Sequence, residues 1–260
     1  MKLEWPPRIH ETALGILVDG AYFIKRYREI EPEYAYDAGH AAECVYRWAI
    51  AHLQQTWNGA NFVRDLYRIF FYDCPPLVKK LHNPISKRVI SFGDSDEANF
   101  RRALHAELQQ KRKVALRLGH LSSDTSWTIK PARIEDLLKR RLGVDDLTED
   151  DVRVVTRQKG VDMRIGLDVS SLAFKRQVRQ IVLIAGDADF IPAAKLARRE
   201  GVDFILDPMW QHVPKGLQEH VDGVRSTCPR PDRKARLAER DSVAHSWRWP
   251  KSVDFDPVPT

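Results

Sequence analysis

The stretch Ile181–Phe190, IVLIAGDADF, decides the fold that this chain is expected to adopt. Five apolar residues, mostly β-branched, lead into a glycine and then into two aspartates that stand two positions apart. A short apolar run that ends at a turn residue is typical of a fully buried strand in a parallel sheet. Asp187 and Asp189 then follow the carboxyl end of this strand, which is where open α/β sheets bind their ligands.

Two other apolar runs also end in an aspartate. Ala13–Val18, ALGILV, is followed by Asp19 and by a glycine that permits a tight turn, and Leu66–Tyr72, LYRIFFY, is followed by Asp73. Asp73 equally suits the start of the turn at the following Cys-Pro-Pro. Because the carboxyl ends of parallel strands lie at one edge of a sheet, we expect Asp19 to lie near Asp187.

Helical and strand patterns alternate along much of the chain. Amphipathic helices are expected over residues 38–55, 97–112, 131–142 and from 162 onward, and further strands over residues 114–121, 127–130, 152–156 and 201–206. Such alternation predicts an α/β fold with three layers, α/β/α, around a central and mainly parallel sheet.

A fourth aspartate, Asp162, opens a predicted helix after the turn at Lys159 and Gly160. Two carboxylates about 4 Å apart repel each other by about 4 kcal/mol at an effective dielectric of roughly 20, and a bound cation relieves that cost. Mg²⁺ or Mn²⁺ suits ligands that are all oxygen. The alternative for each acid is a local role, because Asp caps helices and complements their dipoles.

Composition and the absence of several motifs limit the classes of function that this chain can have. The formal charge of +6 permits a polyanionic partner such as nucleic acid. Three widely spaced cysteines without a CxxC pair favour a reducing compartment, and nine histidines without an HxH or HExxH spacing argue against zinc hydrolysis. The chain has no GxxxxGK[ST] or GxGxxG phosphate cradle. No apolar run approaches the roughly 20 residues of a membrane helix, and MKLEWPPRIHE has no signal-peptide core, so we expect a cytoplasmic protein without membrane contact.

VDG near the N-terminus, then KGVD at the start of a helix, then GDADF after a buried strand, together resemble the NYN domain family. That family includes the LabA-like proteins and is a branch of the PIN-like nucleases. The resemblance spans about residues 13 to 225 and implies a PIN-like sheet of order 3-2-1-4-5 and a Mg²⁺- or Mn²⁺-dependent ribonuclease. The implied catalytic and metal-binding residues are Asp19, Asp162, Asp187 and Asp189.

The family often carries Asn three positions after the first acid, where this chain has Tyr22. We therefore consider two functions: a nuclease that prefers RNA to DNA, and a weak or inactive module that binds nucleic acid and regulates. A phosphatase with an aspartyl nucleophile is disfavoured, because Ala21 stands where a second acid is needed. Lys159 and Tyr22 are the candidate substrate-binding residues, and a homo-oligomer is possible.

The predicted domain covers residues 1–226, with a long loop insertion over 75–97 that we interpret as a lid over the strand ends. Residues 227–260 are expected to form a Pro-rich basic tail, in which arginines and the later tryptophans are candidates for contacts with nucleic acid by charge and stacking.

Overall fold

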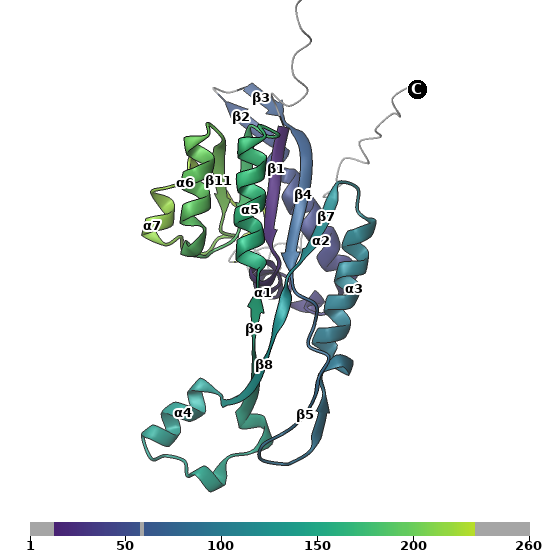
Figure 1. Ribbon diagram of the computed structural model, residues 1–260, viewed down its shortest axis with the longest axis vertical. Helices are drawn as coiled ribbons and strands as arrows, with labels where there is room; N and C mark the ends of the chain where they lie inside the picture. Colours follow the sequence, from purple (N-terminus) through teal and green to yellow (C-terminus); the bar gives the residue numbers. More distant parts are fainter. Residues whose placement is uncertain (1–12, 58–59, 232–260) are drawn as a thin grey trace, which may run out of the picture. The chain divides into compact units, whose positions relative to one another are not determined.

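The computed structural model describes residues 13–57 and 60–231 of the chain. Within these residues six parallel strands form the central sheet, in the order β12-β11-β10-β1-β4-β7 (Figure 1). The strands are β1 (Ala13–Asp19), β4 (Asp65–Asp73), β7 (Val114–Leu118), β10 (Gln180–Ile184), β11 (Asp203–Asp207) and β12 (Gly223–Val224). Numbered along the chain, this is the expected order 3-2-1-4-5 with the short β12 added at one edge.

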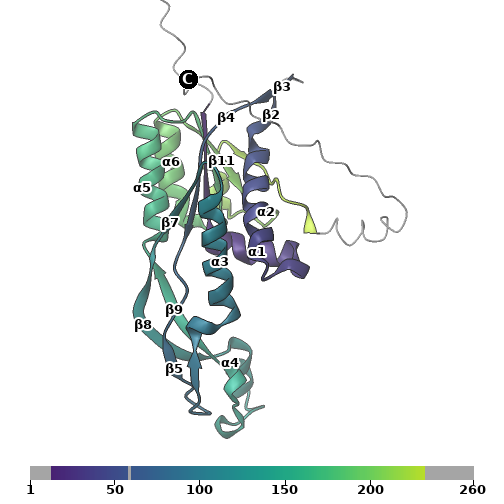
Figure 2. The ribbon, with the colours of Figure 1, turned by 90° about the vertical axis from the view of Figure 1, so that its right-hand side faces the viewer.

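Helices cover both faces of the sheet, which confirms the three-layer α/β/α architecture. Figure 2 shows α1 (Gly20–Ile30), α2 (Ala38–Ile50) and α3 (Asp96–Gln110) on one side, and α5 (Val161–Phe174) and α6 (Ile191–Arg199) on the other. The small α7 (Lys215–Gln218) packs its Leu217 into the core on the side of α5 and α6.

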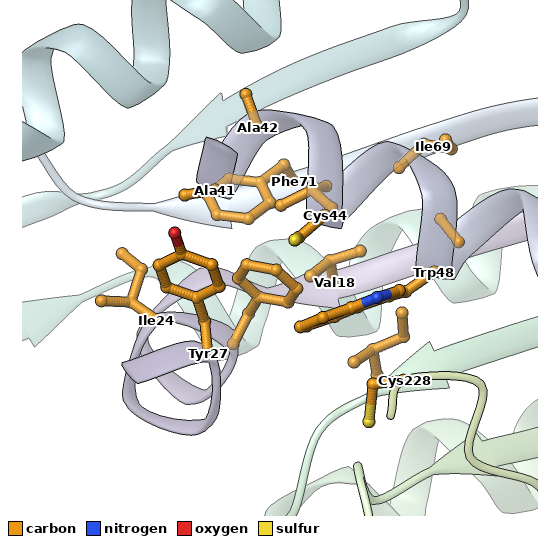
Figure 3. Packing of buried hydrophobic residues seen from close by; sticks show 14 of the residues in the cluster. Val18, Ile24, Tyr27, Ala41, Ala42, Cys44, Trp48, Ile69, Phe71 and Cys228 are labelled. Atoms are coloured by element: carbon orange, nitrogen blue, oxygen red, sulfur yellow. The ribbon is translucent and has the colours of Figure 1, made fainter. Parts of the chain in front are cut away.

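Alternate residues of the buried strands belong to two separate hydrophobic cores, because successive side chains of a strand point to opposite faces of the sheet. Ile16 and Val18 of β1 pack toward α1 and α2, whereas Leu17 packs toward α5 and α6. Figure 3 shows the first core, in which Trp48 of α2 and Phe71 of β4 both pack near Phe23 of α1, with ring centroids 5.5 Å and 6.2 Å from that of Phe23. Trp48 is 7% exposed, so its indole belongs to the core and is not a platform for stacking bases.

The largest departure from the sequence-based expectation is a two-stranded antiparallel ribbon that leaves the main sheet. The strand predicted over 114–121 breaks at Gly119, where β7 ends and β8 (His120–Ile129) begins. β8 pairs with β9 (Val152–Lys159), so the short strands predicted at 127–130 and 152–156 are parts of this single ribbon. An irregularity between Leu121 and Thr125 interrupts the strand alternation of β8, which explains why the local pattern concealed its length.

The tip of the ribbon and the first helical hairpin also differ from expectation. Helix α4 (Pro131–Leu138) stops four residues before the predicted end at 142, and Arg140 adopts a left-handed φ of 54° just after it. The helix predicted over 38–55 ends at Ile50, and β2 (Gln54–Trp57) then pairs with β3 (Ala60–Val63).

The segment 75–97, expected to be a loop, contains a second hairpin. It is made of β5 (Lys80–His82) and β6 (Val89–Ser91), after which α3 begins at Asp96. The segment packs on the ribbon, because the rings of Phe92 and Trp127 lie 6.2 Å apart. No described helix is both long and apolar enough to cross a membrane.

Candidate functional site

The predicted acids meet at the carboxyl edge of β1 and β10. Val18 of β1 pairs with Ile184 of β10, so Asp19 and the corner that begins at Gly186 follow neighbouring strands at the same level. Asp19 is half-buried and caps α1, since its Oδ1 accepts a hydrogen bond of 3.2 Å from the Tyr22 amide. Asp187 is exposed and caps the turn after β10 in the same manner, with 3.1 Å from its Oδ1 to the amide nitrogen of Asp189.

Asp162 lies in the first turn of α5, directly after a turn that requires glycine. Gly160 has a φ of 80°, in the left-handed region that glycine adopts without strain. The Arg164 guanidinium donates 3.0 Å to the Gly160 carbonyl and so fixes this turn. Sequence reasoning did not identify Arg164; its position four residues after Gly160, one helical turn on, is the only local signal.

Electrostatic interactions link the acids of the site through Asp162. The pKa of Asp19 is raised to about 6, mainly by burial and in smaller part by the negative charge of Asp162. The pKa of Asp162 is likewise raised, first by desolvation and then by Asp187 and Asp189. Four residues from three distant parts of the chain therefore share one negatively charged region.

None of these four carboxylates forms an ion pair with a Lys, Arg or His in the described part of the chain. Other acids near strand ends differ sharply. Asp73, at the end of β4, is fully buried between Arg101 and His105, with 2.8 Å from its Oδ2 to His105 Nε2. Asp73 thus stabilises the fold through α3, although its place in the sequence resembles that of Asp19.

Asp207 and Asp168 give the same contrast. Asp207, at the end of β11, binds the buried His52 at 2.9 Å. Asp168, on the same helix as Asp162, accepts 2.7 Å from the Tyr72 hydroxyl and lies 3.3 Å from Arg117 Nε. Each of these structural acids has a side-chain donor, whereas among the described residues the four acids of the site accept hydrogen bonds from backbone amides only, or from no donor.

A divalent cation suits the donor chemistry of the four acids, which is all carboxylate oxygen. Among the described residues, no three side chains of His, Cys, Asp or Glu stand close enough to hold one ion as they are placed. Mg²⁺ does not require such a cage, because it keeps several waters and is usually bound through one or two carboxylates together with substrate phosphates. Asp162 with Asp187 or Asp189 offers such a pair on the exposed side of the site.

Tyr22, which follows the VDG motif, packs against Gly186 of the GDADF motif. Its hydroxyl donates 2.6 Å to the Pro208 carbonyl, and burial raises its pKa. Its ring covers Gly186 so closely that a Cβ there would lie 2.4 Å from Tyr22 Cε2. The structure therefore gives Tyr22 a structural part at the corner, and its binding of substrate stays a prediction.

Lys159 is the last residue of β9 and is exposed. It forms no ion pair with the acids of the site or with any other described residue. Its ammonium group is therefore available to an anion at the border of the acidic region, and its binding of a phosphate stays a prediction.

Comparison with known proteins gives one match. Residues 99–226, about half of the chain, match the model of the NYN domain. The matched range contains Asp162, Asp187 and Asp189 but begins after Asp19, which the sheet itself brings to the same edge. No curated protein and no solved structure matches the chain.

Proposed function

Because the chain carries an NYN domain and so belongs to the PIN-like nuclease superfamily, we propose that it is a metal-dependent nuclease that cleaves phosphodiester bonds, with RNA as the preferred substrate. One observation carries the proposal: acids from three parts of the chain share one edge of the sheet without a cationic partner among the described residues. A nuclease domain implies a nucleic-acid substrate, and related nucleases typically use divalent metals.

Each acid has a distinct part in this proposal. Asp19 is the least exposed and is fixed by the α1 amides, so it gives the site a rigid inner ligand. Asp162, Asp187 and Asp189 are exposed, so they would meet the incoming phosphate. When bound, Mg²⁺ or Mn²⁺ would neutralise the scissile phosphate, activate water and stabilise the leaving oxygen. Lys159 would hold a neighbouring phosphate.

Asp187→Asn tests the proposal, with Asp168→Asn as the matched control. Both changes replace one carboxylate by an isosteric amide, but Asp168 already has protein partners and its amide can still accept from Tyr72. We expect Mn²⁺-dependent cleavage of a labelled RNA to be lost in Asp187→Asn and kept in Asp168→Asn, with both proteins folded by circular dichroism. Full activity in Asp187→Asn would end the proposal.

The same pair of variants tests the metal separately from turnover. A ligand that binds only the folded state at 100 times its Kd stabilises that state by about 2.7 kcal/mol. We expect Mn²⁺ to raise the Tm of the wild type and of Asp168→Asn, and to raise that of Asp187→Asn much less. Equal shifts in all three proteins would mean that the cation binds elsewhere.

A second function, binding of nucleic acid without cleavage, is favoured by one observation. Tyr22 stands where the family often carries Asn, so this chain lacks the Asn side-chain amide at that position. The Tyr22 hydroxyl does not replace it, because it donates to the Pro208 carbonyl. This alternative predicts salt-sensitive binding of RNA without products even in Mn²⁺. Turnover by the wild type, lost in Asp187→Asn, would exclude it.

A further inference from the structure

The two faces of the β8–β9 ribbon differ in chemistry. Side chains alternate between the faces along β9, so Val152, Val154 and Thr156 share one face with their β8 partners Ile129, Trp127 and Thr125. This face is partly buried and meets the 75–97 segment through Trp127 and Phe92. The opposite face of β9 carries Arg153, Val155, Arg157 and Lys159.

The opposite face of β9 is basic, and its positive charges have no acidic partner among the described residues. Arg153, Arg157 and Lys159 are all exposed, and β9 contains no acidic residue. None of the three forms an ion pair with another described residue, and the one acid of β8, Asp124, pairs with none of them. Three positive charges therefore stand on one strand without local neutralisation.

The tip of the ribbon is different, although it is as rich in basic residues. Arg133 lies 2.7 Å from Asp151, Lys139 pairs with Glu135, and Arg141 Nη1 lies 3.9 Å from Asp136. Three of the basic residues at the tip thus have acidic partners, unlike Arg153, Arg157 and Lys159 of β9.

β9 leads directly into the candidate site. It ends at Lys159, and α5 with Asp162 follows after the single residue Gly160, as Figure 1 shows for the junction of β9 and α5. The other strand is tied to the sheet at the same level, since the Gly119 amide donates 2.7 Å to the Asp73 carbonyl. At about 3.3 Å per residue, the three cations extend over about 20 Å from Arg153 to the border of the site.

We propose that this basic face, defined by Arg153, Arg157 and Lys159, is a track that binds the sugar–phosphate backbone of a single nucleic-acid strand and guides it to the four acids. The inference rests on the proposed function and adds the surface that positions the substrate. The occupant is a polyanion because only repeated negative charge matches three exposed cations on one strand. Arg suits this part, because its planar fork binds phosphate oxygens in pairs.

The double variant Arg153→Ala/Arg157→Ala tests the track, and Lys139→Ala/Arg141→Ala is the matched control. Both remove two positive charges from the same arm of the protein, but only the first removes unpaired ones. The probes are fluorescein-labelled single strands of RNA and of DNA of equal sequence, titrated in EDTA by fluorescence anisotropy at several salt concentrations. Circular dichroism and Tm verify that both variants fold.

We expect the wild type and the control to bind alike and the Arg153/Arg157 variant to bind more weakly. Each lost phosphate contact on a single strand lowers the slope of log K against log salt by about 0.7, so the slope should fall by about 1.4. In Mn²⁺ the same variant should lose kcat/KM mainly through a higher KM. The reason is that contacts made by the track are equally strong in the bound substrate and in the transition state.

Each other result of these experiments would refute one stated part of the two proposals. Unchanged affinity and slope in the Arg153/Arg157 variant, with a wild type that binds and cleaves, would refute the track and leave the nuclease proposal intact. An equal loss in the tip control would refute the assignment to β9, and a loss confined to RNA would refute recognition through the backbone alone. A wild type that neither binds nor cleaves either strand would refute both proposals.

Discussion

Removing the charge of Asp19 should make the metal-free protein more stable. The folded state raises the pKa of this carboxyl from 3.8 to about 6, mainly because the group is desolvated. A carboxyl whose pKa is raised on folding holds its proton more tightly in the folded state. Its contribution to stability is therefore complete below pH 3.8 and is lost as the pH rises through about 6.

The magnitude follows from the shift. About two pKa units at about 1.4 kcal/mol each give a penalty of at most about 3 kcal/mol above pH 7. Asp19→Asn removes the charge and keeps the cap, because Asn caps helices as well as Asp and its oxygen can still accept from the Tyr22 amide. At about 2–4 °C per kcal/mol, the gain in Tm is at most about 6–12 °C.

The assay is thermal unfolding in EDTA at pH 4 and at pH 7.5. We expect Asp19→Asn to exceed the wild type clearly at pH 7.5 and only slightly at pH 4, where most of the penalty is absent. Asp168→Asn, whose acid is paired with Tyr72 and Arg117, should show no gain at either pH. An Asp19→Asn protein no more stable than the wild type at pH 7.5, or a gap equal at both pH values, would refute the reasoning.

Two further predictions concern the framework of the site. Asp73→Ala leaves Arg101 and His105 without their buried carboxylate, so we expect the free energy of unfolding in urea to fall by about 3–5 kcal/mol. Arg88→Ala, which removes the exposed pair with Glu149, should lower it by less than about 1 kcal/mol. A small loss in Asp73→Ala would contradict a buried network. Tyr22→Phe keeps the ring on Gly186 but removes the bond to Pro208, so unfolding in urea should show a loss of about 1 kcal/mol, and an unchanged midpoint would mean that this bond contributes nothing.

The match between expectation and structure is good where the information is local. Apolar runs that end in Asp or Gly identified β1, β4 and β10, because strands buried on both faces are continuously apolar. Their alternation with helices then predicted a parallel sheet, whose carboxyl edge collects residues from distant parts of the chain. For that reason the sequence alone could predict that Asp19 and the two acids after β10 lie at the same edge of the sheet.

Local patterns failed for the ribbon. Residues 120–129 and 152–159 stabilise each other across more than twenty intervening residues, and each strand alone carries an irregular or short alternation. The basic face of β9 exists only because the pairing fixes which side chains share a face. Likewise the sequence did not show that the 75–97 segment forms a hairpin against this ribbon.

The sequence by itself determined the sheet, the order of its motifs and the set of acids at its edge. Only the tertiary structure decided which acids keep their charge uncompensated. Asp19 and Asp73 both follow an apolar strand, but α3 brings Arg101 and His105 to Asp73 and brings no cation to Asp19 among the described residues. An ion pair depends on where distant side chains come to lie, and the residues on either side of an aspartate do not encode that.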